Sequence, residues 1–161
     1  MKIPSALVVV SSLVLLAGCG RNDTTAAPAP AAAPGPKTFA LTANDTMKYS
    51  LTRLEVSAGD DVKLTLTNAG AMPKASMAHN WILLKPGSDP GAFSNAAVTR
   101  TADDYFPTEL AGEVIARTKL LGPRESDTVE FKAPAGPGEY TYLCTFPGHY
   151  VSGMHGVLVV H

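Results

Sequence analysis

The chain alternates between apolar and polar residues over much of its length from Lys37 onward, and this pattern predicts short β-strands. Residues 62–67, with the sequence VKLTLT, show it most clearly, because every second side chain is apolar, the period of a strand with one buried face. Residues 80–84 are instead nearly all apolar and predict a further strand. The other expected strands are residues 38–42, 51–56, 126–131, 139–144 and 156–160.

Turn-forming residues separate these strands. Clusters that contain Gly, Pro, Asn or Asp stand at residues 58–60, 68–70, 121–123 and 135–138. Many short strands divided by regular turns are typical of an all-β fold, here an antiparallel β-sandwich. Residues 88–110 break this rhythm, because Asp89-Pro90-Gly91 and Phe106-Pro107 bracket a segment rich in Ala, Asp and Thr. We expect a helical or irregular flap there, inserted between strands.

The first 18 residues have the features of an export signal. Lys2 supplies a positive charge, and the mainly apolar stretch at residues 3–16 is shorter than the roughly 20 residues that span a bilayer. Leu16-Ala17-Gly18-Cys19 then resembles a bacterial lipobox, which is cleaved before a cysteine that becomes lipidated. We therefore expect residues 1–18 to be a lipoprotein signal peptide and Cys19 to carry a lipid anchor. The alternatives are a short membrane helix and an ordinary secretory signal with an unrelated cysteine.

Residues 19–36 are expected to form a tether between this anchor and a single domain at residues 37–161. The segment is rich in Ala and Pro and offers almost nothing to bury, so it favours extended conformations. At about 3.1 Å per residue it would reach on the order of 50 Å. The sequence therefore predicts an exported protein that is lipid-anchored to a bacterial membrane, at its periplasmic or extracellular face.

Composition limits the partners of this protein. The 161 residues are 45% hydrophobic and 17% charged, a globular balance, and the formal net charge is −1. The sequence contains no run of Lys and Arg and no Gly-rich phosphate loop, so we expect no nucleic-acid partner. We expect a monomer that recognises other proteins through a local patch.

Four side chains of metal-binding type lie beside the expected strands. If Cys19 is lipidated, Cys144 has no cysteine to pair with and is a buried apolar residue, an intermolecular disulfide partner or a metal ligand. Its surroundings favour a ligand, because His149 and Met154 follow it closely and His79 precedes another strand. Thiolate and thioether donors suit copper(I), and imidazole suits both copper oxidation states. Two His, one Cys and a weak axial Met describe a blue-copper centre.

Three segments of the chain resemble the azurin and auracyanin branch of the cupredoxins. These segments are MAHNWIL at residues 77–83, VIARTKLLG at 114–122 and CTFPGH at 144–149. The resemblance covers roughly residues 37–161 and implies an eight-stranded Greek-key β-sandwich with one copper ion near one end. It also implies that His79, Cys144 and His149 are the equatorial ligands and that Met154 is the axial ligand.

The resemblance extends to residues around the ligands. It implies that the backbone carbonyl of Ala78, where azurins have Gly, lies near copper. It further implies that Asn80 ties the two ligand loops together and that the Phe146 amide donates a hydrogen bond to the thiolate. The chain departs from azurins because it lacks their disulfide and has one more residue between His149 and Met154, which matches auracyanins. We therefore expect an auracyanin-like protein.

These features together predict a type 1 copper protein that shuttles single electrons at a membrane surface and is not an enzyme. Copper would cycle between copper(I) and copper(II). Electrons would pass through an exposed edge of His149 to redox partners such as a cytochrome or a membrane oxidoreductase complex. A copper storage or delivery module is the alternative, since it would use the same ligands without redox cycling. A copper enzyme would need a second copper site, for which only His155 and His161 remain.

Overall fold

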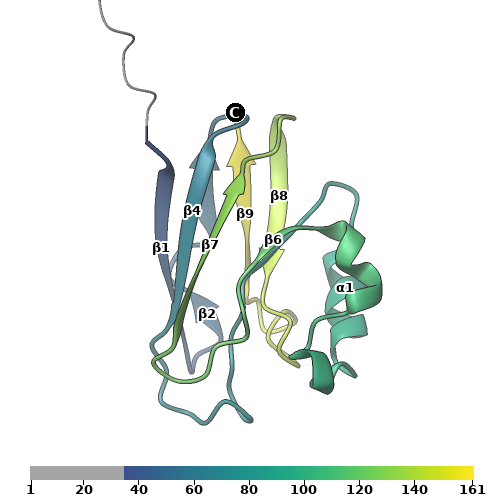
Figure 1. Cartoon of the computed structure of the whole chain (residues 1–161). Helices are drawn as coiled ribbons and strands as arrows, with labels where there is room; N and C mark the ends of the chain where they lie inside the picture. The colour runs from purple at the N-terminus through teal and green to yellow at the C-terminus, as the bar shows by residue number, and fades with distance from the viewer. Residues whose placement is uncertain (1–34) are drawn as a thin grey trace, which may run out of the picture. The chain divides into compact units, whose positions relative to one another are not determined.

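The computed structural model describes residues 35–161, which fold into a sandwich of two β-sheets (Figure 1). The predicted signal peptide, Cys19 and all but the last two residues of the predicted tether lie outside the described residues. Within residues 35–161, no helix combines the length and the apolar character needed to cross a membrane. The all-β sandwich expected from the sequence is confirmed.

One sheet contains four strands in the order β2-β1-β4-β7. Their bounds are Lys37–Asn44 for β1, Lys48–Tyr49 for β2, Asp61–Asn68 for β4 and Ser126–Lys132 for β7. The alternation predicted for β4 is present, because Val62, Leu64 and Leu66 are buried while the residues between them are less so. The buried side of β4 continues to Asn68, a polar residue that faces the core.

The other sheet contains five strands in the order β3-β9-β8-β5-β6. Their bounds are Arg53–Val56 for β3, Ile82–Leu84 for β5, Val114–Arg117 for β6, Gly138–Leu143 for β8 and His155–Val160 for β9. All residues of β5 are buried, in agreement with their apolar run. The two-residue strand β2 and strand β6 were not predicted, although Val114 and Ile115 in β6 are β-branched residues typical of strands.

Two strand pairs depart from the antiparallel arrangement. β1 pairs with β4 in parallel, and β3 pairs with β9 in parallel. After β1 and β2 the chain crosses to the other sheet for β3 and then returns for β4, so β1 and β4 run in the same direction. Crossings of this kind between sheets are typical of Greek-key sandwiches, and eight strands remain if the short β2 is left out of the count.

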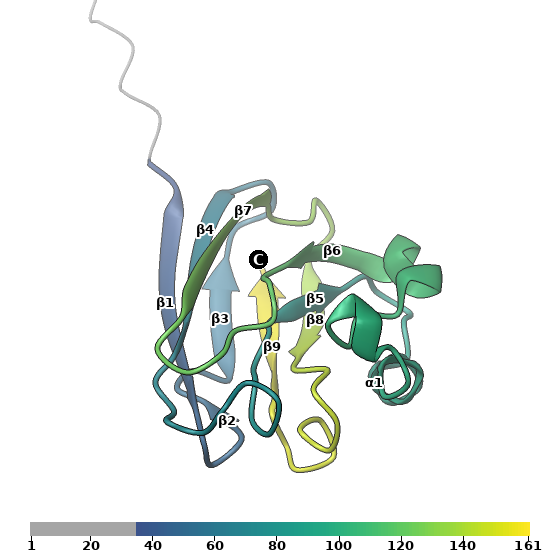
Figure 2. The same ribbon diagram turned by 60° about the horizontal axis from the view of Figure 1, so that its bottom comes forward.

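Between β5 and β6 the chain leaves the sheets and forms the predicted flap (Figure 2). The flap contains helix α1 (Pro90–Ala97) and two 3₁₀ turns, η1 (Thr101–Asp103) and η2 (Thr108–Glu113). Asp89 caps α1, because its carboxylate accepts hydrogen bonds from the amides of Gly91 and Ala92 at 2.8 and 3.1 Å. Phe93 and Phe106 are buried in an apolar cluster with residues of β5 and β8, which fixes the flap against that sheet.

The main core fills the space between the sheets and includes aromatic side chains from both. The ring of Trp81 lies 5.5 Å from that of Tyr142 in β8 and 5.9 Å from that of Phe131 in β7. The same cluster continues past the end of β8 to Cys144 and Met154. The rigid interior of the sandwich therefore extends directly to the predicted ligands.

Candidate metal centre

The predicted ligands meet where the loop between β8 and β9 approaches the residues before β5. One donor atom each of His79, Cys144 and His149 lies within 4.8 Å of the other two. These side chains are 0%, 0% and 1% exposed. Met154 lies in the same loop as Cys144, and its side chain is fully buried in the same apolar cluster. The fold thus brings two distant segments of the chain to one buried point.

Tight turns shape the loop from Cys144 to Met154. The backbone amide of Gly153 donates to the carbonyl of Tyr150 at 2.8 Å. Gly148 and Gly153 have φ angles of 83° and 86°, a left-handed conformation that other residues adopt only with strain. The loop closes at its base, where the Cys144 amide donates to the Met154 carbonyl at 3.2 Å. Three of the predicted ligands are therefore carried on one compact backbone.

The remaining ligand, His79, is held by its own backbone. Its amide donates to the Leu121 carbonyl at 3.1 Å, and the Leu121 amide donates to the His79 carbonyl at 2.8 Å. The buried side chain of Asn68 braces this pair, because its amide group donates to the same Leu121 carbonyl at 3.1 Å. Asn68 was not predicted as a site residue, although its position in the inward-facing series of β4 was an available signal.

A pair of side-chain hydrogen bonds joins the two ligand segments directly. The amide group of Asn80 donates to the Thr145 hydroxyl at 2.7 Å, and the Thr145 backbone amide donates to the Asn80 side-chain oxygen at 2.9 Å. Both residues are buried. The Tyr49 hydroxyl also donates to the Asn80 carbonyl. Asn80 therefore lies where the resemblance placed it, whereas Thr145 and Tyr49 were not anticipated.

The thiol of Cys144 is buried and lies next to other groups that could bind a metal ion. Burial raises its pKa to about 12, and the backbone amides of Asn80 and Phe146 oppose that increase. The sulfur lies 3.4 Å from Nδ1 of His149 and 4.0 Å from the Ala78 carbonyl oxygen. Without a cation the thiol stays protonated near neutral pH, so a bound metal ion must displace its proton.

Both imidazoles are neutral near pH 7. Burial, and secondarily the nearby His79, lowers the pKa of His149 to about 4. Burial also lowers the pKa of His79, while the Asp45 carboxylate and the Asn44 carbonyl act in the opposite direction.

The ring nitrogens of His79 are buried without partners. By distance and angle, neither of them makes a hydrogen bond with any residue among 35–161. Buried polar atoms without partners are costly, and a metal ion would satisfy them. Two neutral imidazoles, a thiol and a thioether fit copper.

These pKa values predict acid sensitivity of the metal-free protein. We expect its free energy of unfolding to fall as the pH drops from about 6.5 towards about 4, because the unfolded chain protonates position 149 before the folded chain does. Denaturant titrations at several pH values, followed by Trp81 fluorescence, measure this. His149→Gln should weaken the dependence, whereas His155→Gln, at an exposed position, should leave it intact. An equal dependence in both variants would contradict the prediction.

The predicted exposed edge of His149 stays a prediction, because little of this residue reaches solvent. The residue is only 1% exposed. Its ring packs against those of Phe146 and His79, with centroid distances of 4.8 and 4.9 Å. His155 is exposed, lies with its ring 5.2 Å from that of Tyr150, and is not part of the donor group.

Comparison with known proteins finds relatives of the kind that the sequence resembles. The family described as copper binding proteins, plastocyanin/azurin family, matches residues 38–161. Auracyanin-B of Chloroflexus aurantiacus is 39% identical over 119 residues, which are 73% of this chain and 49% of that protein, so the chain spans about half its length. Auracyanin-A of the same organism is 34% identical over an alignment that covers all of both chains.

The solved structures agree with this assignment. The structure of auracyanin A from Chloroflexus aurantiacus, described as a "blue" copper protein, superimposes with a TM-score of 0.69 at 37% identity, covering 79% of this chain and all of that one. The predicted resemblance to azurins and auracyanins is confirmed. Since the family match spans the whole β-sandwich, the chain belongs to the plastocyanin/azurin family of copper-binding proteins.

Proposed function

We propose that this protein carries single electrons with one type 1 copper ion held by His79, Cys144, His149 and Met154. The observation that carries the proposal is the buried cluster of two imidazoles and one thiol within 4.8 Å, with Met154 buried on the same loop. When bound, copper supplies the one-electron couple between copper(II) and copper(I). The Ala78 carbonyl oxygen lies 4.0 Å from the Cys144 sulfur, near enough to be a further weak contact to the copper ion.

The role of the protein chain is to keep the donors in one arrangement in both oxidation states. The hydrogen bonds between Asn80 and Thr145 fix the spacing of the two ligand segments. The backbone pair of His79 and Leu121 fixes His79, the ligand outside that loop. Donors that cannot move contribute little reorganisation energy, so electron transfer is fast. Burial of the donors also keeps water away from the site.

The alternative function, copper storage or delivery, has less support. A protein that releases copper readily is expected to hold it in an open, flexible site, whereas these donors are at most 1% exposed and braced by hydrogen bonds. In the described part of the chain, no second group of His, Cys, Asp and Glu side chains converges as this one does. This supports a carrier and gives no support to a copper enzyme with two metal centres.

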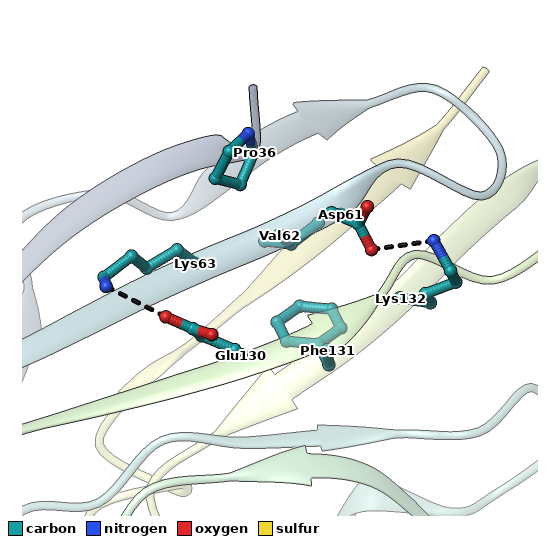
Figure 3. A pocket seen from close by; sticks show the side chains of 7 residues that line it. All are labelled: Pro36, Asp61, Val62, Lys63, Glu130, Phe131 and Lys132. Atoms are coloured by element: carbon teal, nitrogen blue, oxygen red, sulfur yellow. Dashed lines mark hydrogen bonds and ion pairs between the residues drawn. The ribbon is translucent and has the colours of Figure 1, made fainter. Parts of the chain in front are cut away.

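A surface cavity of about 510 Å³ lies apart from the donor group (Figure 3). It is lined by the start of β4, the end of β7 and Pro36, and contains the ion pairs Lys63–Glu130 at 2.9 Å and Lys132–Asp61 at 2.7 Å. The predicted ligands do not line it. Figure 3 shows charged side chains paired across the two strands, which is ordinary cross-strand stabilisation. The cavity therefore adds no support for an enzyme.

The test of the proposed function is spectroscopic. Addition of copper(II) to the metal-free protein should produce an intense blue thiolate-to-copper absorption and an EPR spectrum with narrow copper hyperfine splitting. Both should survive repeated reduction and reoxidation at one copper per protein. A colourless complex, or loss of copper on reduction, would instead indicate storage or delivery.

The proposal includes the location of the protein. The lipobox at residues 16–19 and the Ala/Pro-rich segment that follows support export, lipidation of Cys19 and a tether that lets the domain move near a membrane. Alignment with auracyanin-A over the whole chain is compatible with a shared amino-terminal organisation. The partners would be a cytochrome or a membrane oxidoreductase complex, met through small transient contacts.

Replacement of Cys19 by serine should release the protein from the membrane. Without the thiol no lipid can be attached, and the Ala/Pro-rich segment that remains after cleavage has no long apolar stretch to hold the protein in the membrane. Membrane and soluble fractions of expressing cells, probed by immunoblot, measure the result. Thr24→Ser, a conservative change in the same segment, serves as the control and should remain membrane-bound. If the Cys19→Ser protein stays with the membrane, the lipid anchor is disproved.

A further inference from the structure

Strand β2 is only two residues long, yet its side chains contact both segments that carry the predicted ligands. It lies at the same end of the sandwich as the loop between β8 and β9 (Figure 1, Figure 2). Its backbone pairs with the end of β1, where Ala43 and Asn44 lie opposite Tyr49 and Lys48. Two residue pairs stabilise a strand only weakly, so the side-chain contacts are the main contribution of β2.

The inward-facing residue of β2, Tyr49, holds the segment that carries His79. Tyr49 is 5% exposed, and its hydroxyl donates to the backbone carbonyl of Asn80. Burial, and secondarily the nearby Cys144, raises the pKa of Tyr49 well above its ordinary value. The hydroxyl therefore keeps its proton and remains a donor, which fixes the backbone directly after His79.

The outward-facing residue of β2, Lys48, reaches the ligand loop. Its ammonium group donates to the backbone carbonyl of Ser152 at 2.5 Å. Gly153 leaves room for this contact, because a Cβ added there would lie 2.9 Å from the Lys48 nitrogen and displace it. Since Ser152 stands between His149 and Met154 in the chain, Lys48 holds the turn that joins these two ligands.

This turn is not held by packing against the core. Val151 is 80% exposed, and Ser152 is exposed as well. Apart from the Lys48 contact, the hydrogen bonds of Ser152 stay within the loop, because its amide and its hydroxyl both donate to the Gly148 carbonyl. The hydrogen bonds of Thr145 fix only the start of the loop. Lys48 is therefore a tie between the far end of the loop and the rest of the sandwich.

We propose that β2 is a clamp for the copper site, in which Tyr49 and Lys48 hold the two ligand segments and the charge of Lys48 favours copper(I). This rests on the proposed function. Both are positioning residues, since they act through the backbone of Asn80 and Ser152. In the described part of the chain, no carboxylate lies within ion-pair distance of Lys48. A positive charge without a counter-charge disfavours copper(II) more than copper(I), which raises the midpoint potential.

The midpoint potential of Lys48→Met tests the charge. The substitution keeps an unbranched side chain but removes the donor and the charge. We expect the ratio of the copper(I) to the copper(II) binding constant to fall by about threefold, or about 30 mV, since tenfold is about 59 mV for one electron. Added salt should reduce the difference, and Lys48→Arg should restore the potential. Lys63→Met, at a lysine paired with Glu130 apart from the donor group, should leave it unchanged.

Hydrogen exchange in the metal-free protein tests the contact without copper. The amides of Ser152, Gly153 and Met154 all donate within the loop. We expect them to exchange several-fold faster in Lys48→Met, as measured by NMR, because the loop opens more often without its outer tie. Lys48→Arg and Lys63→Met should exchange as the unmodified protein does. If Lys48→Met changes neither the exchange nor the potential while the blue band is retained, the clamp is disproved and the proposed function stands.

Tyr49→Phe tests the inner half of the clamp. It removes only the hydroxyl and keeps the ring, whose centroid lies 5.6 Å from that of Tyr142. The His79 amide should exchange faster in this variant while the Ser152 amide does not respond, and Lys48→Met should show the opposite pattern. An unchanged His79 amide in Tyr49→Phe would overturn the role of Tyr49. Absence of a blue band from the unmodified protein with copper would instead overturn the proposed function.

Discussion

Replacing Cys144 with serine is expected to abolish the blue absorption and to weaken copper binding by more than about 100-fold. Loss of a residue that only supports the ligands lowers metal affinity by up to about 100-fold, and loss of a ligand itself should cost more. The thiolate is the donor that gives a type 1 site its intense charge-transfer band, and a serine hydroxyl does not ionise to replace it. Titration of the metal-free protein with copper, followed by visible absorption and by a competing chelator, measures both effects.

Met154→Leu is the matched control for this change. It also removes a sulfur from the same buried loop, but it conserves volume and leaves the two imidazoles and the thiol in place. The blue band should remain and the midpoint potential should change, because the axial ligand tunes the potential. If Cys144→Ser kept the blue band, the assignment of the thiolate donor would be refuted.

Asn80→Leu should lower the free energy of unfolding by about 2–4 kcal/mol, because the substitution leaves the buried Thr145 amide and hydroxyl without partners. Leucine has the same number and branching of side-chain heavy atoms as asparagine, so it leaves no cavity and the loss is of hydrogen bonds. The variant should still bind copper, with weaker affinity, because the two ligand segments lose their direct connection. Denaturant unfolding of the metal-free protein and copper titration measure the two effects.

Thr145→Val separates the two hydrogen bonds. It removes the hydroxyl acceptor but keeps the backbone amide that donates to Asn80. Its destabilisation should therefore be smaller than that of Asn80→Leu, and the double variant should be less destabilised than the sum, since the residues share one interaction. Additive effects would mean that the two side chains are not coupled and that the ligand segments are held together by packing alone.

Much of the fold could be predicted because the strands carry local patterns. The alternation in β4 and the apolar run in β5 follow directly from which faces of each strand are buried. The flap was predicted because Asp89-Pro90-Gly91 and Phe106-Pro107 bracket a segment that breaks the rhythm of the strands. Strand β6 was missed because Val114–Arg117 is short and only weakly patterned, and its pairing with β5 depends on distant residues. The parallel pairing of β1 with β4 depends on the route of the chain between sheets.

The sequence by itself determined the chemistry of the donor set, because Cys144, His149 and Met154 lie close together in one loop and His79 belongs to a recognisable segment. The brace from Asn68 through Leu121 to His79, and the contacts of β2 with both ligand segments, were decided only by the tertiary structure. These contacts join residues from separate strands and from the ligand loop. Their geometry depends on how the two sheets pack, so no local pattern encodes it. Burial of His149 has the same origin: neighbouring rings cover it, and one of them, His79, comes from a distant part of the chain.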